Sequence, residues 1–133
     1  MDFLSIRIIT DDPQRLAGFY QRVTGIAPTW YTPDFGEVVT PSCTLAIAHR
    51  RTMELFAAGA ARPADNHSVI VEFRVADVDA LYREHADALG APVQPPTTMP
   101  WGNRSLLVRD PDGNLVNFFT PVTPQAIAKL ARR

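Results

Sequence analysis

The sequence predicts an α+β fold in which two βαβββ repeats form a curved, partly open mixed sheet. Three observations lead to this fold class. Segment 3–25 has a counterpart 65 residues further along the chain, so that Asp12 corresponds to Asp77. Alternating apolar residues before each of these Asp residues indicate a strand, and helical spacing after each indicates a helix. Segment 110–113, with the sequence Asp-Pro-Asp-Gly, is typical of a hairpin turn between two strands.

The first repeat is expected over about residues 1–56. Its first strand begins near the start of the chain, because Leu4, Ile6 and Ile8 recur at every second position. Asp12 is placed to cap the following helix, which has a proline at its first position, and Gly25 stands just beyond its end. Three further strands are expected at 30–32, 37–40 and 44–48.

The second repeat is expected over about residues 67–121, after an Ala-rich linker at 57–66. Asp77 is placed to cap its helix, and Gly90 to end that helix in the left-handed conformation. The helical residues expected to face inward are Val78, Leu81, Tyr82 and Leu89. Strands are expected at 92–94, 104–109 and 114–119, followed by a C-terminal helix at 124–132. Together the repeats are expected to form a single domain over residues 1–133.

Composition limits the classes of partner. The chain has 13 basic and 14 acidic residues, and this balance argues against nucleic acid or an anionic membrane as a partner. Its basic cluster, Lys129, Arg132 and Arg133, is interpreted as cations at the end of the last helix. The single cysteine, Cys43, is interpreted as an inert thiol. Without an apolar run long enough for a membrane span, and without a signal peptide, the chain is expected to be a soluble, cytoplasmic protein.

One face of each predicted sheet is left uncovered by the helix of its repeat. On the first strand, the apolar even positions are expected to meet the helix, and the odd positions the concave side. The odd positions are Phe3, Ser5, Arg7 and Ile9, and their counterparts are Ser68, Ile70, Glu72 and Arg74. This mixture is too polar for a plain core and favours a lined cleft for a small ligand.

Four segments carry a resemblance to a known family. They are FYQRVTG, VADVDALY, PWGNR and RDPDGNLVNFF, in that order along the chain. The chain resembles the vicinal oxygen chelate superfamily, which includes glyoxalase I, bleomycin resistance proteins and extradiol dioxygenases. The resemblance implies the glyoxalase/bleomycin-resistance fold for nearly the whole chain. It also implies a concave face where the enzymes of the superfamily hold a divalent metal with His, Gln or Glu.

The metal-ligand positions implied by the resemblance carry unsuitable residues. They fall on Ser5, Ile70 and Asn117, and near Ala46. Hydrocarbon side chains cannot bind a metal, and Ser and Asn are poor ligands for borderline metals. We therefore expect neither a metal nor a cofactor. A substitute site built from His49 and Glu72 is the alternative, although partly exposed histidines at 49, 67 and 85 are the favoured interpretation.

The residues expected to bind a ligand are Ser5, Arg7, Ile70, Glu72, Trp101, Asn117 and Trp30. Arg7 and Glu72 are repeat mates and are expected to meet, either as a plain ion pair or as polar anchors for a ligand. The two tryptophans offer flat surfaces on which a ring can stack, and the alternative is that they pack in the core or in a dimer interface. No catalytic residue is assigned.

Two classes of function follow from these residues. The first is a metal-independent small-molecule-binding protein of the glyoxalase/bleomycin resistance type, which would sequester an aromatic or antibiotic-like ligand. The alternative is a metal-dependent lyase or dioxygenase of the same superfamily, and a lesser one is acid–base catalysis by Arg7 and Glu72. Whether the protein is an enzyme is left open. The expected partners are a small-molecule ligand and a second copy of the chain in a homodimer.

Overall fold

The computed structural model describes residues 1–132, and Arg133, which ends both the predicted basic cluster and the predicted domain, lies outside the described residues. The chain divides into two compact units. The first comprises residues 1–66 with 111–113, and the second comprises 67–110 with the segment that begins at Asn114. In the described part of the chain, no helix has the length and apolar character needed to cross a bilayer. The single-domain organisation over 1–133 stays a prediction.

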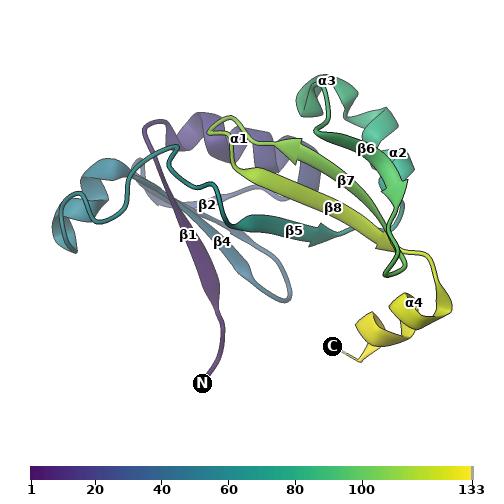
Figure 1. The fold of residues 1–133 in the computed structure, drawn as a ribbon. Coiled ribbons are helices and arrows are strands. Elements are labelled where there is room, and N and C mark those ends of the chain that lie inside the picture. Colours follow the sequence, from purple (N-terminus) through teal and green to yellow (C-terminus); the bar gives the residue numbers. More distant parts are fainter. Residues whose placement is uncertain (133) are drawn as a thin grey trace. The chain divides into compact units, whose positions relative to one another are not determined.

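The first unit is a βαβββ arrangement (Figure 1). Its elements are β1 (Ser5–Thr10), α1 (Pro13–Thr24), β2 (Thr29–Thr32), β3 (Phe35–Val39), β4 (Thr44–His49) and the short 3₁₀ helix η1 (Arg50–Leu55). The strand order is β1-β4-β3-β2, with β1 parallel to β4 and the other pairs antiparallel. The parallel pair requires the crossover that α1 provides.

The second unit repeats this arrangement and adds a helix. Its elements are β5 (Ile70–Arg74), α2 (Val78–Glu84), α3 (Ala86–Leu89), β6 (Gln94–Thr98), β7 (Asn103–Arg109), β8 (Leu115–Pro121) and α4 (Pro124–Ala131). The strand order is β5-β8-β7-β6, again with one parallel pair, β5 and β8. The predicted α+β class with two βαβββ repeats is therefore confirmed, and β1 and β5 begin 65 residues apart, as the internal similarity requires.

Both predicted helix starts are confirmed by the capping contacts. The carboxylate of Asp12 accepts a hydrogen bond from the backbone N–H of Arg15 at 3.1 Å, and that of Asp77 accepts one from Ala80 at 3.1 Å. Each contact satisfies one of the free N–H groups in the first turn of a helix. Gly25 ends α1 with φ 74° and ψ 5°, the left-handed conformation predicted for it.

The end of the second helix differs from the prediction. Helix α2 stops at Glu84, and after a break at His85 a separate turn, α3, runs to Leu89. Gly90 has φ 67° but ψ −161°, which is outside the left-handed helical region. Because Gly lacks a Cβ, it can adopt this conformation and lead the chain directly away from the helix.

Strand β6 also differs from the prediction, which placed it at 92–94. It starts at Gln94 and includes Pro95 and Pro96, and it lies at the edge of its sheet, paired only with β7. Proline is tolerated at an edge because one side of the strand needs no N–H donor. The pairing register of β6 shifts between Gln94 and Thr97, where the prolines stand.

Helix α1 covers one face of its sheet and forms the core of the first unit. The buried side chains of this core are Leu16, Phe19, Tyr20 and Val23 from α1, with Val38, Leu45 and Ile47 from the strands. Burial of each large apolar side chain contributes roughly 1.5–3 kcal/mol. Phe3 and Leu4 were expected in the first strand, but they precede β1 and take no part in this core. They are 80% and 73% exposed. The alternation in the sequence thus continues beyond the paired strand.

The sheet of the second unit has one apolar face and one polar face. Residues that alternate along its strands and are packed on the apolar face include Val71, Leu106, Val108, Val116 and Phe118. Their neighbours point to the opposite face because the side chains of a strand alternate. The opposite face, called the polar face below, therefore carries Glu72, Asn103, Ser105 and Asn117 together with the apolar residues Ile70, Leu107, Leu115 and Phe119. This polar face is where the candidate site lies.

Candidate functional site

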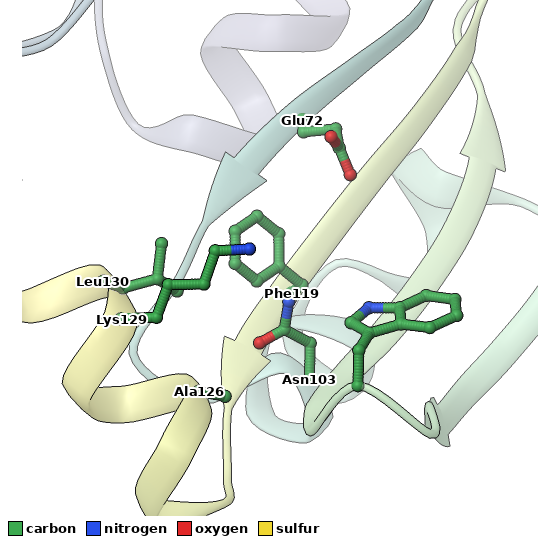
Figure 2. A pocket seen from close by; sticks show the side chains of 7 residues that line it. Glu72, Asn103, Phe119, Ala126, Lys129 and Leu130 are labelled. Atoms are coloured by element: carbon green, nitrogen blue, oxygen red, sulfur yellow. The ribbon is translucent and has the colours of Figure 1, made fainter.

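A pocket of about 300 Å³ lies on the polar face of the second sheet (Figure 2). Its floor comes from three strands, and its outer wall comes from α4. The lining residues are Glu72, Trp101, Asn103, Phe119, Ala126, Lys129 and Leu130. All seven belong to the second unit, so this unit forms the pocket by itself.

Glu72 is held in place by its neighbour on β8. The register pairs Glu72 with Asn117, and the Asn117 side-chain amide donates a hydrogen bond to Glu72 Oε2 at 2.7 Å. A hydrogen bond to a carboxylate is stronger than one between neutral groups. The other carboxylate oxygen has no partner in the described residues, and it is available to a ligand. Phe119, two residues after Asn117, supplies an apolar surface beside this carboxylate.

The turn before β7 places Trp101. Gly102 has φ 95°, and its N–H donates to the carbonyl of Met99 at 2.9 Å. A Cβ on Gly102 would lie 2.1 Å from the Thr123 hydroxyl and 3.0 Å from Ala126 Cβ. The turn thus packs directly against the start of α4, which only glycine permits. Trp101 is 66% exposed and lines the pocket.

Helix α4 forms the wall opposite the sheet. It starts at Pro124, and the Thr123 hydroxyl caps it by accepting the N–H of Ala126 at 3.2 Å. Ala126 is buried against the turn, and Leu130 packs one turn further on. In Figure 2 the side chain of Lys129 extends from α4 toward the sheet. It makes no ion pair with any carboxylate among residues 1–132.

Three buried polar atoms on this face lack hydrogen-bond partners in the described part of the chain. They are Asn103 Oδ1, Ser105 Oγ and Asn117 Oδ1. Ser105 is only 4% exposed, and Asn103 lines the pocket. A buried polar group without a partner costs about 1–3 kcal/mol, so such atoms usually face a water or a ligand. These three oxygens are acceptors that no donor among residues 1–132 satisfies.

These residues can bind and orient a small molecule. The pocket offers a carboxylate, an amide oxygen and an ammonium group around an apolar surface made by Phe119, Trp101 and Leu130. None of the lining residues is Ser, Cys or His, and the ionisable groups of the lining are the Glu72 carboxylate and the Lys129 ammonium. The lining combines polar groups, which can fix the orientation of a small molecule, with apolar groups, which reward its burial.

The predicted site residues of the first unit belong to its own sheet. Ser5 and Arg7 are exposed on β1, and the Arg7 guanidinium lies 4.8 Å from the ring centre of Phe35 and 5.2 Å from that of Phe56. Such cation–π contacts hold the guanidinium in place. Trp30 packs its ring over Gly36, where a Cβ would be 2.7 Å from the ring. The predicted meeting of Arg7 with Glu72 stays a prediction.

Tyr31 on β2, an edge strand of the same sheet, shares with Arg7 a contact to Phe35. A hydrogen bond to the carboxylate of Glu37 raises the pKa of Tyr31 above its ordinary value. The ring of Tyr31 also lies 5.6 Å from that of Phe35. These contacts keep an aromatic group on the face that carries Arg7.

The first unit has a pocket of its own beside η1, of about 340 Å³. Its cationic lining is neutralised, because Arg50, Arg51 and Arg62 pair with Asp11, Asp34 and Asp65. The pair with Arg51 holds the pKa of Asp34 below its ordinary value. His49 accepts the N–H of Arg51 through Nδ1 at 3.1 Å and so caps η1. This pocket leaves few polar groups for a ligand.

Three of the predicted binding residues come together in the second unit. Glu72 and Trp101 line the same pocket, and Asn117 positions Glu72. Ile70 lies exposed at the start of β5 and does not line it. Asn103, Phe119 and the residues of α4 were not predicted from the sequence. Alternation along the last strand, continued from Asn117, would have found Phe119.

The metal-ligand positions of the superfamily do not fit a metal in this chain. Ala46 and Ile70 carry hydrocarbon side chains, and Asn117 is engaged with Glu72. Among residues 1–132, no three His, Cys, Asp or Glu side chains are grouped closely enough to hold a metal ion.

Comparison with known proteins places this architecture in a family. The family model described as the Glyoxalase/Bleomycin resistance protein/Dioxygenase superfamily matches residues 3–118. The chain belongs to this superfamily, as its two βαβββ units and the sequence motifs indicated. No curated protein matches the chain.

Several solved structures share the fold. A glyoxalase/bleomycin resistance protein/dioxygenase family enzyme from Burkholderia phytofirmans PsJN is 19% identical, with a TM-score of 0.82 over 92% of this chain and 100% of the other. A protein of unknown function from Agrobacterium tumefaciens is 24% identical, with a TM-score of 0.77 over 90% and 94%. A glyoxalase-related enzyme from Fulvimarina pelagi is 21% identical, with a TM-score of 0.75 over 93% and 94%. At these identities the likeness concerns the fold alone.

Proposed function

We propose that the protein binds a small, partly aromatic organic molecule in the pocket of the second unit and does so without a metal. One observation carries this proposal: an apolar surface and unpartnered polar atoms meet in a single pocket. Phe119 and Trp101 offer the surface, and Asn103 Oδ1 is buried there without a partner in the described residues. A volume of about 300 Å³ is at the lower end of the range for small-molecule sites.

The absence of a metal requirement rests on the donor set. Two of the four positions that the superfamily uses carry Ala46 and Ile70, which have no donor atom. A metal-dependent lyase or dioxygenase would need donors there. Sequestration of an aromatic or antibiotic-like molecule needs only the pocket. The predicted homodimer and cytoplasmic location are compatible with this proposal and stay predictions.

The test uses the fluorescence of Trp101. The chain has two tryptophans, so Trp30→Phe leaves Trp101 as the reporter, and Trp101→Phe leaves Trp30 as the matched control. We expect 4-nitrobenzamide, a neutral aromatic amide that quenches indole, to quench the Trp30→Phe variant in a saturable manner. In Trp101→Phe the quenching should be weak and proportional to concentration, as in free solution.

Calorimetry measures the same binding without fluorescence. Stacking on an aromatic ring is worth about 0.5–1.5 kcal/mol beyond burial, so Trp101→Ala should weaken binding of 4-nitrobenzamide at least about two- to tenfold. The Trp30→Phe variant should bind as the wild type does. Equal affinity in wild type and Trp101→Ala, or saturable quenching of Trp30 alone, would place the ligand elsewhere and refute the proposal.

A further inference from the structure

The pocket has opposite charges on opposite walls. Glu72 stands on β5, at the sheet, and Lys129 stands on α4, across the pocket (Figure 2). Within the described residues the two do not form an ion pair with each other or with another residue. By contrast, Arg50, Arg51 and Arg62, which line the pocket of the first unit, are paired with carboxylates.

The groups near Glu72 favour a ligand that donates hydrogen bonds. One oxygen of Glu72 accepts from Asn117, and the other has no donor in the described part of the chain. Asn103 Oδ1 lines the same pocket and has no donor either, although it is buried. Two acceptors of this kind, one of them charged, are best satisfied by an ammonium or another cationic N–H group.

On the opposite wall, Lys129 favours a ligand that carries an acidic group. The ammonium group of Lys129 carries three donors and no acceptor, and its stem lies beside Leu130 and Phe119. A carboxylate or another anionic group of a ligand would complement it. Between the two walls the ring of Phe119 provides a surface for the ligand's apolar part, where burial is rewarded.

We propose that the pocket of the second unit selects an amphoteric ligand. Its cationic N–H group would bind Glu72 and Asn103, its acidic group would bind Lys129, and its apolar body would lie on Phe119. This inference rests on the proposed function, because it specifies the chemistry of the molecule bound at the same site. An α-amino acid with an aromatic side chain is the simplest compound with these three features.

Three probes that share one ring separate the charges. L-Phenylalanine carries both charges, phenethylamine carries only the cation, and 3-phenylpropionate carries only the anion. We expect calorimetry at low salt to show that L-phenylalanine binds about three- to tenfold more tightly than either singly charged probe, a range set by the partial exposure of both side chains. Raising the salt concentration should reduce this preference.

Two variants assign each charge to its wall. Glu72→Gln keeps the shape of the side chain and an oxygen for Asn117, and it should weaken phenethylamine and L-phenylalanine about three- to tenfold without affecting 3-phenylpropionate. Lys129→Met should weaken 3-phenylpropionate and L-phenylalanine by a similar factor without weakening phenethylamine. Glu84→Gln on α2 and Arg132→Met after α4 remove the same charges outside the pocket lining, and both should bind all three probes as the wild type does.

The outcomes distinguish the two proposals. If all three probes bind with equal affinity and neither pocket variant alters them, the amphoteric preference is refuted, and the binding of neutral 4-nitrobenzamide still supports the proposed function. If Lys129→Met leaves the binding of 3-phenylpropionate and L-phenylalanine unchanged, Lys129 does not bind the acidic group, and the opposed-charge arrangement is refuted. If neither the charged probes nor 4-nitrobenzamide binds, both proposals fail.

Discussion

Replacement of Gly102 by Ala tests how α4 is packed against the turn that precedes β7. Gly102 has φ 95°, and an added Cβ would lie 2.1 Å from Thr123 Oγ1 and 3.0 Å from Ala126 Cβ. The hydroxyl of Thr123 caps α4, so the new methyl group would push away the residue that starts this helix. The substitution therefore acts on the turn and on α4 together.

The expected loss of stability has two parts. A non-glycine residue in this backbone conformation costs about 1–3 kcal/mol, and overpacking by a methyl group costs about 1–3 kcal/mol more. The free energy of unfolding should thus fall by about 2–6 kcal/mol. With an unfolding entropy near 2.1 cal/mol/K per residue, this corresponds to a decrease in Tm of roughly 7–20 °C for a chain of 133 residues.

Gly113→Ala is the matched control for the backbone part. Gly113 also has a positive φ, 82°, but no atom lies within 4 Å of the position that an added Cβ would take. Denaturant unfolding of both variants separates strain from crowding, and amide hydrogen exchange reports whether α4 opens in Gly102→Ala. Equal loss of stability in the two variants, with unchanged exchange in α4, would refute the argument that this close contact holds α4 to the turn.

The remaining predictions concern pH and metal. Bidentate hydrogen bonds from Arg104 hold the pKa of Asp79 below its ordinary value of 3.8, so the stabilisation from this pair is present above about pH 4 and is lost as the pH falls further. Wild type should therefore lose Tm more steeply than Asp79→Asn below about pH 4, and parallel pH profiles would contradict this. Elemental analysis of dialysed protein should find far less than one divalent metal ion per chain, whereas about one retained Zn, Ni, Fe or Mn would revive the metal-dependent alternative.

The repeat architecture could be predicted because its signals are local. The Asp at each helix start, the alternation before it and the turn at 110–113 each act over a few residues, and the capping contacts of Asp12 and Asp77 confirm the first of these. Alternation along β5 also placed Glu72 on the polar face. These features need no knowledge of which segments pack together.

The part of the site that was missed depends on tertiary packing. Lys129 was interpreted as a cation at a helix end, because the sequence does not show against which surface α4 packs. Helix α4 packs against the turn before β7, because Gly102 lies close to Thr123 and Ala126. This contact depends on the path of the chain after β8. Ile70 was assigned to the site from strand parity and from its place at a metal-ligand position of the superfamily, and it stands at the exposed beginning of β5.

The two prolines of β6 have a consequence for self-association. In an extended strand, successive N–H groups point to opposite sides, so Pro95 and Pro96 together remove one donor facing β7 and one facing outward. The missing inward donor coincides with the register shift between Gln94 and Thr97. The missing outward donor deprives any incoming strand of a hydrogen bond along this edge. Edge strands are the usual templates for β-aggregation. The two prolines of β6 therefore hinder the addition of another strand at this edge.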